Sequence, residues 1–143
     1  MMAWPESVCE VRVRYAETDQ MGVAYHTNYL VWCEIGRTEL MRELGMPYAA
    51  LEQAGVFLAV AETHVRFMAA ARYDERIRIR TRLERLQSRA VTFVYELTRD
   101  GPEGPVRVAS ASTKLIAMDG NGAARTLPDA FLDAIRKLRS VVP

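Results

Sequence analysis

Alternating apolar and polar residues in the second half of the chain are the feature that most constrains its fold. Four segments have the length and residue types of extended strands: 57–69, 75–87, 90–99 and 106–118. In the second segment, apolar residues and one threonine alternate with arginines and a glutamate, which gives the strand one dry face and one wet face. This pattern is typical of an antiparallel sheet that is covered on one side only.

The first half of the chain supplies one more strand and the longest predicted helix. Residues 8–15 alternate and place Val11, Val13 and Tyr15 on one face. Residues 27–44 have helical spacing, with Gly45 as a natural residue after the helix end. The expected buried stripe of this helix comprises Tyr29, Cys33, Gly36, Leu40 and Leu44, widened by Trp32 and Ile35.

Shorter elements complete the chain. A second helix is predicted over residues 47–54, and a third begins at Pro128 with Phe131, Ile135 and Leu138 on one face. The order of strand, long helix and then four strands predicts one α+β domain over residues 1–143, with the helix covering the apolar face of an antiparallel sheet. Glycine weakens a helix interior, so Gly36 indicates close packing against that sheet.

Composition excludes several classes of function. The 143 residues carry a formal net charge of +1 and contain no zinc-ligand spacing, which argues against nucleic-acid binding. Neither a signal peptide nor a membrane-spanning segment is predicted, so we expect a cytoplasmic protein. The two cysteines, Cys9 and Cys33, occupy apolar positions and are expected to be buried free thiols.

The stretch from Arg14 to Tyr29 combines residues that suit acyl chemistry. Asp19 lies in a turn beside Gly22, and His26 lies just before the long helix. A carboxylate in that place could face a substrate carbonyl while N–H groups at the helix start polarise its oxygen. The alternative interpretation is an ordinary turn aspartate that binds nearby backbone N–H groups.

The residues of this stretch resemble a known family. The matching positions are Tyr15, Thr18-Asp19, Gly22-Val23, Tyr25-His26, Asn28-Tyr29, Glu34 and Arg37-Thr38-Glu39, continued by residues 69–72. They resemble the 4-hydroxybenzoyl-CoA thioesterase family and, within it, the YbgC-type acyl-CoA thioesterases. The resemblance implies a hotdog fold, hydrolysis of acyl-CoA, no metal, and no cofactor other than the coenzyme A of the substrate. It also implies homodimers, formed by joining the sheets, that assemble into homotetramers.

The resemblance also implies roles for particular residues. Asp19 matches the catalytic aspartate, acting either as nucleophile or as general base on water. His26 matches the residue whose backbone N–H polarises the thioester carbonyl, and its imidazole either orients Asp19 or a water, or has no catalytic duty. Substrate contacts are expected from Gly22, Val23, Tyr25 and Tyr29, although aromatic residues at a helix start are often part of the core or an interface.

Several alternatives stay open from the sequence. Glu34 lies where another hotdog subfamily places its catalytic carboxylate, but ion pairs of Glu34 with Arg37 and of Glu39 with Arg42 are favoured. Other functions considered are hydrolysis of acyl carrier protein thioesters, non-catalytic binding of acyl-CoA, and hydration on the same fold. Three arginines are weak candidates for contacts with CoA phosphates: Arg72, Arg89 and Arg125.

Overall fold

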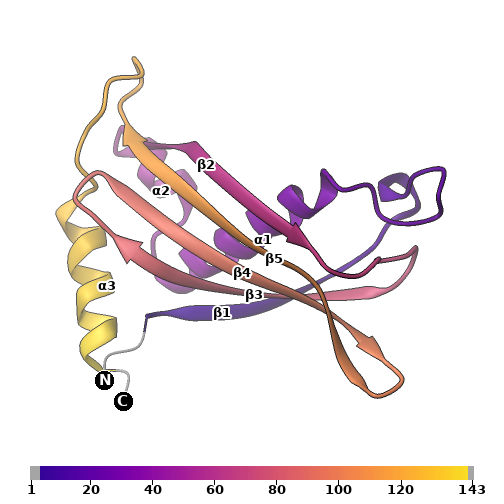
Figure 1. The fold of residues 1–143 in the computed structure, drawn as a ribbon. Helices are drawn as coiled ribbons and strands as arrows, with labels where there is room; N and C mark the ends of the chain where they lie inside the picture. Colours follow the sequence, from indigo (N-terminus) through magenta and orange to yellow (C-terminus); the bar gives the residue numbers. More distant parts are fainter. Residues whose placement is uncertain (1–3, 142–143) are drawn as a thin grey trace.

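The computed structural model describes residues 4–141, which form one curved sheet with helices packed against it (Figure 1). All strand pairs are antiparallel, and the order across the sheet is β1-β3-β4-β5-β2. The strands are β1 (Glu6–Arg12), β2 (Phe57–Phe67), β3 (Arg76–Leu86), β4 (Ala90–Gly101) and β5 (Gly104–Met118). The predicted α+β arrangement of an antiparallel sheet and one long helix is confirmed.

The long helix α1 (Asn28–Glu43) lies in the curve of the sheet. It packs mainly against β3 and β1 and less against β4. Strand β2 forms one edge of the sheet, and most of its residues are exposed. The sheet therefore has a well-covered half around β1, β3 and β4, and a more open half towards β2.

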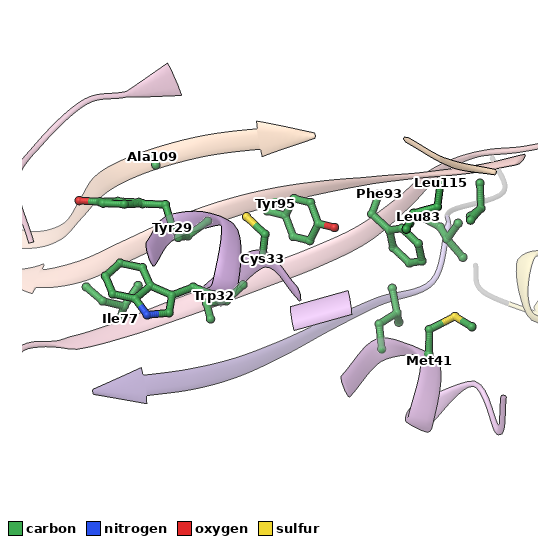
Figure 2. Close-up of a cluster of buried hydrophobic side chains, with 14 of the residues drawn as sticks. Tyr29, Trp32, Cys33, Met41, Ile77, Leu83, Phe93, Tyr95, Ala109 and Leu115 are labelled. Atoms are coloured by element: carbon green, nitrogen blue, oxygen red, sulfur yellow. The ribbon is translucent and has the colours of Figure 1, made fainter. Parts of the chain in front are cut away.

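The buried side of α1 agrees in large part with the predicted stripe. Its buried residues are Tyr29, Trp32, Cys33, Gly36, Leu40 and Met41. They face the alternate residues of β3 and β4, among them Ile77, Phe93 and Tyr95 (Figure 2). Ile35 is an exception because it lies on the solvent side of the helix, 36% exposed.

Gly36 marks the closest approach of the helix to the sheet. A Cβ atom at this position would collide with Thr81 Oγ1 and would lie 2.8 Å from Ile79 Cγ2. Both neighbours are buried residues of β3. The prediction that this glycine permits close packing is therefore confirmed.

Three shorter elements complete the described chain: the 3₁₀ turn η1 (Tyr15–Glu17), α2 (Tyr48–Gln53) and α3 (Asp129–Val141). Strand β1 ends at Arg12, so Tyr15 belongs to the 3₁₀ turn and is 78% exposed, contrary to its predicted place on the buried face of the strand. In α3, Phe131 and Ile135 are fully buried as predicted, whereas Leu138 is 38% exposed.

Candidate active site

A tight loop between η1 and α1 carries Asp19. The Asp19 N–H donates to the Val23 carbonyl at 2.9 Å, and the Gly22 N–H donates to the Asp19 carbonyl at 3.0 Å. Gly22 has a φ of 76°, a conformation that favours glycine. Just outside the loop, Thr18 pairs with Ala24 in an isolated antiparallel bridge. These bonds hold the aspartate at the start of a closed turn.

The Asp19 carboxylate is partly used by its own loop. Its Oδ1 accepts the Met21 N–H at 2.9 Å and the Val23 N–H at 3.4 Å. No hydrogen bond from the described residues reaches Oδ2. The turn interpretation therefore describes one carboxylate oxygen, and the other stays available to a ligand.

Asp119 forms the same turn at the end of β5. Its Oδ1 accepts the Asn121 and Ala123 N–H groups at 2.8 and 3.0 Å, and Gly122 has a φ of 81°. These backbone hydrogen bonds lower the pKa of the Asp119 carboxyl. Turn geometry alone therefore does not distinguish a catalytic aspartate from a structural one.

What distinguishes Asp19 is the start of α1 that follows its loop. The N–H groups of residues 28–30 donate to the carbonyls of residues 25–27 at distances of 3.0, 3.3 and 3.1 Å. Within residues 4–141, no carbonyl partner is found for the N–H of His26 or Thr27. These two exposed donors lie at the positive end of the helix, where an oxyanion is stabilised.

The His26 side chain packs against aromatic rings. Its ring centroid lies 4.6 Å from that of Tyr25 and 6.1 Å from that of Phe67, the last residue of β2. In the described structure no hydrogen bond joins the imidazole to Asp19. The geometry therefore favours the backbone N–H of His26, and not its imidazole, as the functional group.

The four predicted substrate-contact residues lie in different environments. Gly22 and Tyr25 are exposed, and Val23 is partly exposed. Tyr29 is only 3% exposed, and its ring packs against those of Trp32 and Phe67 at centroid distances of 4.8 and 5.1 Å. Burial raises the pKa of the Tyr29 hydroxyl, partly offset by a hydrogen bond with the Ala71 backbone. Tyr29 is thus a core residue at the rim of the site.

Glu17 and Asn28 are residues of this site to which the sequence analysis gave no role. Glu17 is 4% exposed, and its carboxylate accepts hydrogen bonds from the Arg14 backbone and the Trp32 indole. The Asn28 side chain donates to the Glu17 carbonyl at 2.9 Å. A carboxylate two residues before the loop was the available signal, but its burial depends on the tertiary fold.

The two predicted ion pairs on α1 have different outcomes. Arg42 and Glu39 form the predicted ion pair. Arg37 does not pair with Glu34, because its guanidinium points inward and Nη1 donates to the Tyr95 hydroxyl at 3.5 Å. Glu34 is exposed, and within the described residues no ion pair joins it to Arg37. The Glu34–Arg37 prediction is therefore wrong.

A polar hollow of about 720 Å³ lies on the outer face of the sheet, away from α1. Its lining includes Arg66, Arg80, Arg82 and Arg107 but neither Asp19 nor His26. We place the site at the loop and not in this hollow, because the hollow contains no carboxylate beside free helix N–H groups.

The three arginines considered for CoA lie at different ends of the molecule. Arg89 and Arg125 belong to the connections after β3 and β5, at the opposite end of the sheet from the start of α1 (Figure 1). Arg125 donates to the Gly55 carbonyl at 3.0 Å. Arg72 lies near the site, because the carbonyl of the preceding residue, Ala71, accepts the Ala24 N–H at 2.7 Å.

Residues 4–141 contain neither a membrane-spanning helix nor a metal-binding cluster. None of the helices there has the length and apolar composition needed to cross a membrane. The same residues contain no group of three or more His, Cys, Asp or Glu side chains that could hold a metal ion.

Comparison with known proteins identifies the family. The profile of the thioesterase-like superfamily matches residues 13–135, which is most of the chain. The chain therefore belongs to this superfamily, and the predicted family and thioesterase class are confirmed. The match includes both the Asp19 loop and the start of α1.

Individual relatives agree with this assignment. The chain is 36% identical to YneP of Bacillus subtilis over 102 residues, covering 71% of this chain and 74% of YneP. It is 31% identical to the acyl-CoA thioester hydrolase YbgC of Escherichia coli over 97 residues, covering 68% and 69% of the two chains.

A solved structure supports the predicted fold. The structure is similar to the DHNA-CoA thioesterase from Staphylococcus aureus, with a TM-score of 0.88 and 28% identity over 95% of this chain and 92% of the other. The predicted hotdog fold is therefore confirmed.

Proposed function

We propose that this protein is an acyl-CoA thioesterase that releases a free acid and coenzyme A, with Asp19 and the start of α1 as its catalytic centre. The names of YbgC and the Staphylococcus aureus enzyme support a CoA thioester as substrate. The observation that supports the assignment of the site is that the loop with a partly free carboxylate leads into two N–H groups at the helix start that find no acceptor within residues 4–141.

The chemistry needs few groups because a thioester is already activated. Acting as a general base, Asp19 Oδ2 takes a proton from water as the water oxygen attacks the carbonyl carbon. Acting as a nucleophile, the same oxygen forms a mixed anhydride that water then hydrolyses. In both routes the N–H groups of His26 and Thr27 stabilise the oxyanion, and the CoA thiolate leaves and takes up a proton.

The proposal includes assembly through the edge strand β2. Phe67, at the end of β2, contacts both His26 and Tyr29, so a second copy paired along β2 would border the site. Such a dimer, and the tetramer built from it, would also protect a long exposed strand edge. We place this single hotdog domain in the cytoplasm, which fits its two free thiols and a CoA substrate.

The test compares two aspartates with the same turn geometry. Asp19→Asn should lower hydrolysis of acyl-CoA by about 100-fold or more, because a neutral amide neither attacks nor accepts the proton. Asp119→Asn changes an equivalent turn far from the helix start and should leave the rate within about twofold of the wild type. The hydrolysis rates of both variants are measured as the release of free thiol from a panel of short, long and aromatic acyl-CoAs.

Equal rates for the Asp19 variant and the wild type would contradict the assignment of Asp19. The variant Glu34→Gln tests the other carboxylate, and we expect it to keep nearly full activity. Loss of activity there, with Asp19→Asn unaffected, would move the catalytic role to Glu34. Absence of any thiol release by the wild type would favour the non-catalytic binding module.

Matched substrates separate the two enzyme hypotheses. The same acyl group is offered on CoA and on acyl carrier protein, and kcat/KM is compared for the two. A preference for CoA supports the proposal, whereas a strong preference for the carrier protein would support the alternative that the sequence left open.

A further inference from the structure

Glu17 is a buried carboxylate with a partner on each oxygen. Its Oε1 accepts the Arg14 backbone N–H at 2.8 Å, and its Oε2 accepts the Trp32 indole N–H at 3.0 Å. The Arg14 guanidinium adds an ion pair, with Nε at 3.4 Å from Oε1. The side chain thus joins the segment that enters the Asp19 loop to the second turn of α1.

The Glu17 backbone carbonyl joins the same parts from the other side. It accepts the Tyr25 N–H at 2.8 Å and the Asn28 side-chain N–H at 2.9 Å. Tyr25 ends the loop and Asn28 begins α1. One residue therefore holds the entrance of the loop, its exit and the first two turns of the helix.

Closing the turn itself does not require this arrangement. The Asp119 turn is closed by equivalent backbone bonds and by the same carboxylate-to-amide contacts. In the described structure no buried carboxylate ties the Asp119 turn to a helix. The bonds of Glu17 instead determine where the Asp19 loop lies relative to α1.

We propose that Glu17 is a positioning residue that holds the Asp19 carboxylate and the free N–H groups at His26 and Thr27 in one relative placement. This inference rests on the proposed function and adds to it a residue that does not touch the substrate. Small displacements of a catalytic group lower the rate strongly, so loosening this link should lower kcat more than it changes KM.

A pair of substitutions tests the link. In Glu17→Gln, the side-chain amide replaces one acceptor oxygen with an NH₂ group, which must face either the Arg14 N–H or the Trp32 indole N–H. Trp32→Phe removes the indole donor and keeps an aromatic ring. The double variant lacks both sides of the Glu17–Trp32 contact, so it measures whether the two single losses have the same origin.

We expect Glu17→Gln to lower kcat by about 10- to 100-fold with KM within about threefold. Trp32→Phe should lower kcat in the same way, and the double variant should lose little more than either single variant, because all three lack the same contact. Glu10 lies on β1 and forms an exposed ion pair with Arg78 of β3. Glu10→Gln is the matched control for loss of a negative charge and should keep the wild-type rate. A glutamate that served stability alone would lower the melting temperature without this kcat-specific loss.

Amide hydrogen exchange gives a readout that does not depend on turnover. The Gly22 and Tyr25 amides should exchange about tenfold faster in Glu17→Gln, and the double variant should add little to this increase. Unchanged exchange, a wild-type kcat in Glu17→Gln, or fully additive losses in the double variant would each overturn the positioning role. A wild type without hydrolysis would instead overturn the proposed function, and exchange would still decide whether Glu17 holds the loop.

Discussion

Cys33 and Tyr95 bring two titratable groups into the interface between α1 and the sheet. Cys33 is 2% exposed and Tyr95 is 3% exposed, and both are drawn together in Figure 2. Burial raises the pKa of the Cys33 thiol from 9.0 to about 12, and it also raises the pKa of Tyr95 from 10.0 to about 12. Arg37 acts in the opposite direction on both groups, but burial is the larger cause.

The raised pKa of Cys33 makes the stability of the fold sensitive to alkali. The neutral thiol is favoured by the folded state, so its contribution is complete below the unfolded pKa of 9.0 and is lost as the pH rises towards 12. We expect the free energy of unfolding to fall between pH 8 and pH 11 by on the order of 1–3 kcal/mol more in the wild type than in Cys33→Ala. Urea unfolding at the two pH values measures the fall in the free energy of unfolding for each protein. Equal falls in the wild type and in Cys33→Ala would contradict the prediction.

The residues of the site show what the sequence could and could not establish. The Asp19 turn and the helix start were predictable, because Gly22 and the change of periodicity after His26 are local signals. The inward turn of Arg37 was not predictable, because a helical ion pair with Glu34 is equally compatible with local spacing. The role of Glu17 also depends on Trp32, fifteen residues away.

At the scale of elements, the strands were predictable because each has a buried face on alternate residues. Ile77, Ile79 and Leu83 are fully buried on β3, as the alternation indicates. The end of β1 was less clear, since Tyr15 continues the alternation after the strand has ended. There the backbone turns to form η1, and the Glu17 carboxylate stabilises that turn by accepting a local hydrogen bond from the Arg14 N–H and a tertiary one from the Trp32 indole.

The contact between α1 and β3 gives a stability prediction. Alanine would normally strengthen a helix interior by about 1 kcal/mol relative to glycine. Gly36→Ala should instead destabilise the protein by about 1–3 kcal/mol, because its Cβ would collide with Thr81 and press on Ile79. Chemical denaturation measures the change. Adding Thr81→Ser, which removes only a methyl group, should give little relief, because the hydroxyl involved in the collision remains.

At the scale of the whole molecule, the sheet has two edges that differ in length and exposure. Strand β1 has seven residues and β2 has eleven. The sequence predicted both strands but not their places at the ends of the order β1-β3-β4-β5-β2, because non-local pairing leaves no local pattern. The edge strand β2 borders the candidate site through Phe67.

Two exposed valines on these edges allow a matched test of the proposed dimer. Val60 on β2 is 54% exposed, and Val8 on β1 is 47% exposed. Charged residues on an edge strand oppose pairing with another chain. We therefore expect Val60→Lys to shift the protein towards the mass of one chain in light scattering and to lower hydrolysis in parallel, because the second copy would border the site. Val8→Lys introduces the same charge at the other edge and should leave both mass and rate unchanged. A wild type that is fully active at the mass of one chain would contradict the dimer. The proposed chemistry would remain intact, because Asp19 and the free N–H groups belong to a single chain.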